Sequence, residues 1–144
     1  MPSKSTVQRA KADLRAGKRP STAAGEFVRE EIEHIREGKH GARSAKQAIA
    51  IGLSKARRAG VPLQPPEEGR TSRRTRKSAK RDLATGQGKR KPRSTSARRR
   101  RATVKALRSE PRSAASHRAL SRQAKKTARR RRSTGQRARK QTSR

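Results

Sequence analysis

The chain has 144 residues, and its 44 Lys and Arg against 10 Asp and Glu give a formal net charge of +34. Only 26% of the residues are hydrophobic, with one Phe and no Trp, Tyr or Cys, which excludes a single large core, disulfides and thiolate sites. Neither an apolar leader nor a membrane-length apolar run is present. We therefore expect a soluble, cytoplasmic protein whose charge is neutralised by a polyanion.

A short first helix is predicted over about residues 5–16, ending at Gly17, which suits the left-handed position after a helix. It offers only Val7 and Leu14 for burial, so it should be marginal.

The second predicted helix follows Pro20, with Ser21 or Thr22 as its cap, and stops at Gly38. It carries an apolar stripe at helical spacing, formed by Phe27, Val28, Ile32 and Ile35. Its acidic residues are expected to form a solvated face, made of Glu26, Glu30, Glu33 and Glu37. This is the strongest hydrophobic element of the chain.

A third helix is predicted from the capping-box spacing of Ser44 and Gln47 to a stop at Gly60. One face carries small and aliphatic residues, namely Ala45, Ala48, Ile49, Gly52, Leu53 and Ala56. The second and third helices should pair as a small antiparallel hairpin. Because so small a module buries little surface, it could require a homo-oligomer, a protein partner or a ligand.

The charge distribution divides the chain near Gly69. Residues 1–69 carry a net charge of +6 and residues 70–144 a net charge of +28. We predict a helical module over 1–61, a Pro-rich linker over 62–69 and a basic tail over 70–144. The expected fold class is mostly α: a hairpin or three-helix module followed by a largely disordered tail.

The tail is rich in Ala and Arg, which favour helix, so residues 96–109 and 114–132 have latent helicity. Repulsion between neighbouring cations opposes those helices until phosphates screen them. We expect disorder in the free tail and partial helix on nucleic acid.

Two segments resemble each other within the chain. Residues 10–22 (AKADLRAGKRPST) are matched by residues 79–86 (AKRDLATG) and then by 89–95 (KRKPRST) after a short insertion. Either a short helix with a basic turn is used twice, or biased composition has converged by chance.

Two short motifs have both a binding and a plain interpretation. Residues 88–93 (GKRKPR) resemble a basic, proline-flanked minor-groove motif, or form a linker that contacts phosphates. Residues 38–41 (GKHG) fit a backbone-clamping GXXG loop, but no strands accompany them, so a turn is favoured. Lys39, Arg43 and Lys46 could still contact phosphate near the start of the third helix.

Catalytic and metal chemistry are not indicated. His34, His40 and His117 have no Cys partners and no spacing that pairs two of them on one helical face, so no metal site is predicted. No nucleophile triad, phosphate loop or carboxylate pair is present. We expect a protein that is not an enzyme and needs no cofactor or small-molecule substrate.

The polyanion is expected to be nucleic acid. With one Phe the chain cannot stack single-stranded bases, which favours duplex DNA bound through its phosphates without sequence readout, as in a nucleoid-associated protein. An RNA- or ribosome-associated protein and a protein-interaction adaptor are the alternatives. The residues expected to contact phosphate are Arg73, Arg74, Arg76, Lys77, Lys80, Arg81, Lys89, Arg90, Lys91, Arg93, Arg98, Arg99, Arg100, Arg101, Arg129, Arg130, Arg131 and Arg132.

Residues 33–60 resemble the core of a bacterial family of small basic proteins of unknown function, most specifically in the string SAKQAIAIGLSKARRAG of residues 44–60. The resemblance covers less than a quarter of the chain. It implies a short helical motif joined to a Lys/Arg-rich tail, in proteins often labelled DNA-binding. The tail resembles linker-histone-like tails in composition alone.

Overall fold

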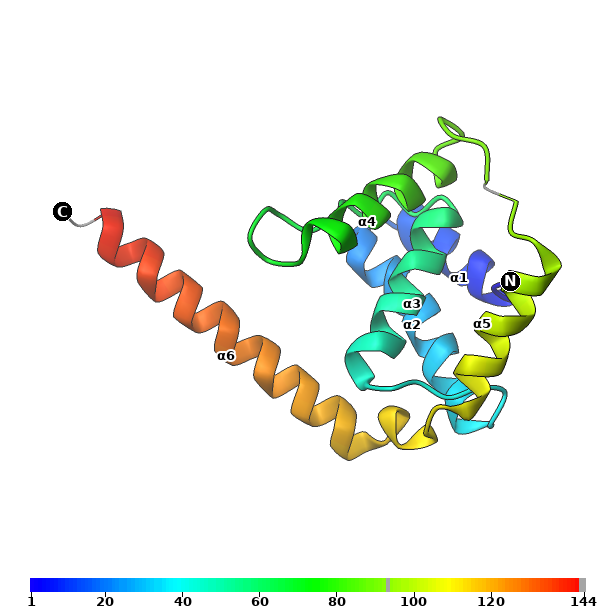
Figure 1. Ribbon diagram of the computed structural model, residues 1–144. Coiled ribbons are helices and arrows are strands. Elements are labelled where there is room, and N and C mark those ends of the chain that lie inside the picture. The colour runs from blue at the N-terminus through cyan, green and yellow to red at the C-terminus, as the bar shows by residue number, and fades with distance from the viewer. Residues whose placement is uncertain (93, 143–144) are drawn as a thin grey trace.

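The computed structural model describes residues 1–92 and 94–142, with side chains to residue 133. The described part is helical and contains no strand, which confirms the predicted mostly-α class. Its elements, shown in Figure 1, are α1 (Lys4–Arg15), α2 (Pro20–Arg36), α3 (Ala45–Arg58), α4 (Arg73–Gly86), α5 (Ala97–Ser109), the 3-10 turn η1 (Arg112–Ala115) and α6 (His117–Thr142).

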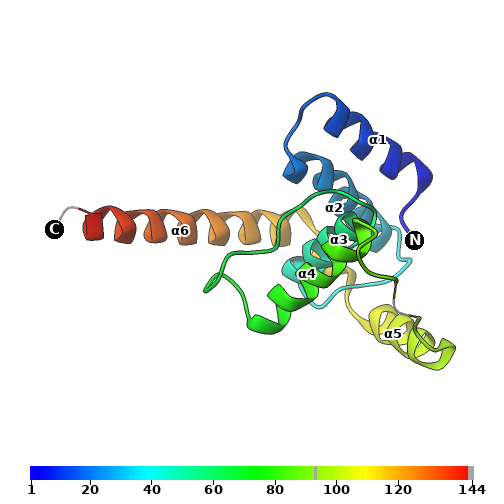
Figure 2. The same ribbon diagram turned by 90° about the horizontal axis from the view of Figure 1, so that it is seen from above.

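The centre of the fold is the pair α2 and α3, which pack closely against each other (Figures 1 and 2). A Cβ atom at Gly52 would lie 2.6 Å from the Cα of Val28. Only glycine therefore allows the two backbones to approach this closely. The apolar stripe of α2 supports the same contact, since Phe27 and Ile35 are completely buried.

The first hydrophobic cluster joins α1 to one end of this pair. Ala10, Phe27, Ala56 and Val61 are among its buried residues. Within α1 the buried residues are Thr6 and Ala10, whereas Val7 and Leu14 are only partly buried against the cluster. Small residues on α1 let the helix lie close to α2, and the two larger ones cover the edge of the contact.

The start and the polar face of α2 differ from the prediction. Pro20 is the first helical residue and Arg19 precedes it without a side-chain capping bond, so neither Ser21 nor Thr22 caps the helix. The expectation of a fully solvated acidic face was wrong for Glu30, which is 5% exposed. Its Oε1 accepts a hydrogen bond of 2.7 Å from the backbone N of Ser3, because the N-terminus folds over α2.

The packed region extends beyond residue 69. Ala79 and Leu83 of α4 are buried where this helix packs on α3, and the hydroxyl of Ser54 donates to Asp82 at 2.6 Å. The Pro-rich segment is also held in place, since Arg57 donates to the carbonyl oxygens of residues 63 and 64. The hairpin thus gains partners from a segment that was predicted to be tail.

A second hydrophobic cluster lies at the other end of α2 and α3. Ala114 and Ala115 of η1 are buried there with Ile35, Ala42 and Ala48. The backbone N of Ala42 donates to the carbonyl of Pro111 at 3.1 Å, which fixes η1 to the loop between α2 and α3. This contact decides where α6 leaves the body of the protein.

The two similar segments both form a helix, but the two helices end differently. Ala10 on α1 and the matching Ala79 on α4 are both buried, α1 packing on α2 and α4 on α3. Gly17 follows α1 with φ of 74°, whereas the matching Gly86 is the last residue of α4 and the positive-φ glycine there is Gly88 in the insertion. A helix with a buried alanine therefore packs on each side of the central pair.

The helices α5 and α6 coincide broadly with the segments for which latent helicity was predicted. No residue of α5 is buried, and α6 extends away from the body as a single helix (Figure 2). Disorder of these segments in the absence of nucleic acid stays a prediction. None of the described helices is both long and apolar enough to cross a membrane.

The cap of α3 should contribute measurably to stability. Ser44 Oγ accepts from the backbone N of Gln47 at 3.2 Å, while Gln47 Oε1 accepts from the backbone N of Arg43. Ser44→Ala should lower the free energy of unfolding by about 1 kcal/mol, because a helix-end amide loses its partner. Ser96→Ala is the control, since Ser96 caps α5, which contributes no buried residue. Equal effects of the two changes in urea unfolding would contradict this difference.

Candidate nucleic-acid interface

The cations of α4 lie on its exposed side because Ala79 and Leu83 occupy the buried side. Arg76 differs from its neighbours: it is half-buried and pairs with Glu68 at 3.1 Å. Among the residues of α4 that were predicted to contact phosphate, those that are exposed are Arg73, Arg74, Lys77, Lys80 and Arg81.

The loop after α4 and the start of α5 carry the next group of cations. Lys89, Arg90 and Lys91 are exposed in a segment without helix or strand, and Arg93 lies outside the described residues. The minor-groove interpretation of this loop stays a prediction. In α5, Arg98, Arg99, Arg100 and Arg101 are all exposed.

The basic run of α6 is exposed on a helix that projects from the body (Figure 1). Arg130 and Arg131 line a cavity of about 440 Å³ together with residues 67–70. The linker loop therefore approaches α6 from the side of α4. The run consists of Arg129, Arg130, Arg131 and Arg132.

A second group of cations gathers at the N-terminus of α3. The surface there is hollowed by about 320 Å³, and its lining includes Arg43 from the loop and Arg122 and Lys126 from α6. Lys46 is exposed in the first turn of α3. Since the first turn of a helix carries partial positive charge, this corner combines the helix end with cations from two elements.

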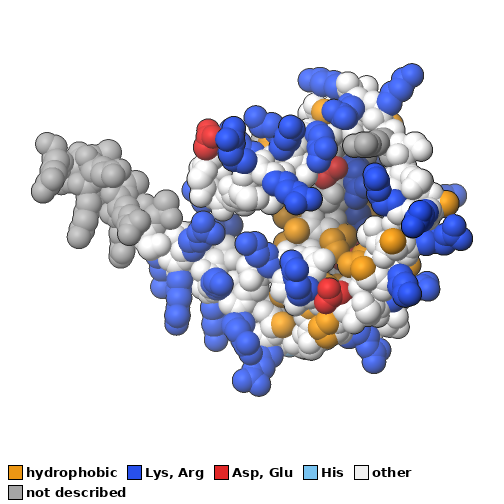
Figure 3. Space-filling model, viewed as in Figure 1, with side chains coloured by type: hydrophobic (Ala, Val, Ile, Leu, Met, Phe, Trp, Pro, Cys, Tyr) orange, Lys and Arg blue, Asp and Glu red, His pale blue; other side chains and the backbone are white. Residues whose placement is uncertain are grey.

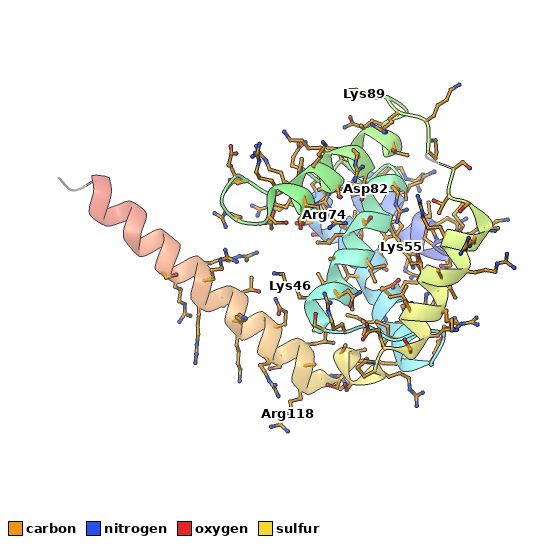
Figure 4. All side chains as sticks on the ribbon, in the orientation of Figure 1. Lys46, Lys55, Arg74, Asp82, Lys89 and Arg118 are labelled. Carbon is orange, nitrogen blue, oxygen red and sulfur yellow. The ribbon has the colours of Figure 1, made fainter. Side chains whose placement is uncertain are left out.

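The adjoining groove between α3 and α4 has a different character. It has a volume of about 430 Å³, and Ile49 and Leu53 line it with Lys46 and Arg74. Figure 4 shows Lys46 on α3 and Arg74 on α4, both on the side of the molecule toward which α6 extends. In Figure 3 hydrophobic side chains are visible on this face among many Lys and Arg, with a few acidic side chains beside them.

Many acidic groups are paired within the protein, which leaves the basic excess at the surface. Glu31 is 1% exposed and pairs with Lys55, and Asp82 contacts Ser54. Lys39 is the predicted contact that this pairing affects: it lies 2.8 Å from Glu37, and its hydrogen bond lowers the pKa of Glu37. Lys39 is therefore partly neutralised, unlike Lys46.

The structure brings Arg43 together with two cations that sequence reasoning did not select, Arg122 and Lys126, whereas Lys46 lines the adjoining groove. The spacing of four residues between Arg122 and Lys126 places both on one face of a helix, which was a usable signal. The α5 cations lie on the other side of α3 from α6 (Figure 1). The predicted contacts thus form separate surfaces.

Similarity to known proteins gives no information about this surface. A scan against protein-family models, a search of curated proteins and a search of solved structures each return no match. The resemblance of residues 33–60 to a family of basic proteins therefore stays an expectation.

Proposed function

We propose that this protein binds duplex DNA through the phosphate backbone, without reading base sequence, and coats or bridges DNA in the manner of a nucleoid-associated protein. The observation that carries the proposal is the exposure of cations on α4, α5 and α6, while buried Glu30 and Glu31 face inward. Each cation that approaches a phosphate releases a counterion, which favours binding irrespective of sequence. The role is binding and not catalysis.

The choice of duplex over single strands rests on the aromatic content. Phe27 is the one aromatic residue of the FWY type in the chain, and it is completely buried. No such side chain is therefore exposed to stack on unpaired bases, which is the usual means of binding single strands. Cations on helices instead suit a regular line of phosphates.

The test is the affinity of the full chain for one duplex and one structured RNA, measured across a salt series. If roughly ten phosphates are engaged, the slope of log K against log salt should approach about −9. We expect the duplex to compete effectively against the RNA. A slope smaller than about 2 in magnitude would contradict electrostatic binding, and preference for RNA would favour an RNA- or ribosome-associated protein.

A second candidate function is that of an adaptor, which binds a protein partner while its basic tail localises it to DNA. The groove between α3 and α4, with Ile49 and Leu53 in its wall, is the observation that favours it. An apolar groove with a basic rim suits a partner segment that is apolar and acidic. Such binding would survive salt concentrations that release DNA.

A further inference from the structure

A Glu-x-x-His pair on α2 is joined in space by a second histidine from the following loop. Glu31 and His34 are three residues apart and lie on one face of the helix. The turn at Gly38, with φ of 78°, returns the chain so that His40 reaches the same face. One ligand atom from each of the three lies within 4.8 Å of those of the other two.

The hydrogen bonding of His40 leaves one ring nitrogen facing a carboxylate. Its Nδ1 lies 2.9 Å from the carbonyl oxygen of Gly41, and a carbonyl only accepts, so Nδ1 carries the proton. Its Nε2 then lies 3.1 Å from Glu31 Oε1, which is also an acceptor. Two acceptors at this distance require either a proton or a metal ion between them.

The arrangement around His40 is the one that metal-bound histidines adopt. Such a histidine commonly donates its other ring N–H to a carbonyl or carboxylate, which orients the ring. The pocket also excludes much of the solvent, because the side chains of Glu31, His34 and His40 are 1%, 23% and 16% exposed.

His34 supplies the third donor from the same face of α2 as Glu31. Its ring lies edge-on to that of His40, with centroids 6.5 Å apart. Glu30, whose Oε2 has no hydrogen-bond partner among the described residues, adds a buried negative charge 3.9 Å from His34 Nε2.

We propose that Glu31, His34 and His40 bind one divalent transition-metal ion of the Zn²⁺ class. Two imidazoles and a carboxylate are a ligand set that Zn²⁺ accepts, with water in the fourth position. Ligand atoms around tetrahedral Zn²⁺ are about 3.3 Å apart, so the Glu31 to His40 distance already fits. The ion would tie α2 to the loop of residues 37–44, on which η1 docks.

The positive charge of Lys55 should weaken metal binding at this site, so a variant without that charge tests the proposal. Its Nζ pairs with Glu31 Oε2, so it neutralises part of the carboxylate charge from α3. Removal of this ammonium should strengthen metal binding by about tenfold or more, because a like charge near the ion disappears. Damage to the fold would change affinity in the opposite direction.

The experiment titrates the metal-free full chain, without nucleic acid, with Zn²⁺ by calorimetry and with Co²⁺ by visible absorption. We expect one equivalent of Zn²⁺ and the intense absorption of tetrahedral Co²⁺. His34→Gln and His40→Gln should each weaken binding by about tenfold or more. His117→Gln is the matched control, since His117 is exposed at the start of α6, and should bind like the wild type.

Three results would overturn the proposal. The first is that the wild type takes up no stoichiometric metal or leaves Co²⁺ octahedral, which would mean that a proton and not a metal lies between His40 and Glu31. The second is that His117→Gln loses as much affinity as the other two variants. The third is that both His34→Gln and His40→Gln bind metal normally. If either glutamine variant is unfolded by circular dichroism, Lys55→Met decides: tighter binding supports the site, and unchanged or weaker binding refutes it.

Discussion

Removal of four cations around the N-terminus of α3 is expected to weaken duplex binding far more than removal of four cations from α5. Both sets are exposed on the surface, so neither variant should unfold the protein. The test variant replaces by Gln the residues Arg43, Lys46, Arg122 and Lys126. The control variant replaces by Gln the residues Arg98, Arg99, Arg100 and Arg101.

The reason for the difference is the arrangement of the charges. In the test set, Arg43 from the loop and Arg122 and Lys126 from α6 line one hollow beside the N-terminus of α3. Lys46 is exposed in the first turn of that helix, so one stretch of duplex can contact all four cations. Loss of four phosphate contacts should reduce the salt slope by about 3 to 4 and the affinity on the order of 100-fold. The α5 cations surround an isolated helix, so fewer of them can contact the same duplex.

The measurement is duplex affinity across a salt series for the wild type and both variants. Since each variant loses four charges, total charge alone predicts equal losses. Equal slopes and affinities for the two variants would mean that the hollow at α3 is not the interface, although electrostatic binding itself would stand. A larger loss in the α5 variant would move the interface to the other side of the molecule.

Gly52→Ala is expected to destabilise the fold by about 1 to 3 kcal/mol, because a methyl group must enter the contact between α2 and α3. The new Cβ would lie 2.6 Å from Val28 Cα, and backbone cannot rotate away as a flexible side chain can. That change is a large fraction of the total stability of a small domain.

Gly25→Ala is the matched control for Gly52→Ala, since Gly25 also lies inside a helix but nothing is within 4 Å of its added Cβ. It should stabilise the protein by about 0.5 to 1 kcal/mol, which is the usual advantage of alanine over glycine in a helix. Urea unfolding followed by circular dichroism measures both. If Gly52→Ala is also stabilising, α2 and α3 do not approach as closely as described.

The sequence by itself determined the local structure and the overall charge. The helices α2 and α3, the Ser44 cap and the burial of Phe27 follow from apolar spacing and capping residues within a few positions of each other. The exposure of most basic residues also follows from the sequence, because the chain has too little apolar surface to cover them. These properties depend on neighbours that are close in the chain.

Only the tertiary structure decided which distant residues meet. Glu30 is buried because the N-terminus folds over α2, and the site of Glu31, His34 and His40 exists because the turn at Gly38 reverses the chain. Residues 114 and 115 enter the core because their small side chains fit beside Ile35. Helical periodicity predicts which face of a helix is apolar, but partners separated by many residues are chosen by packing and desolvation, which a local pattern does not encode.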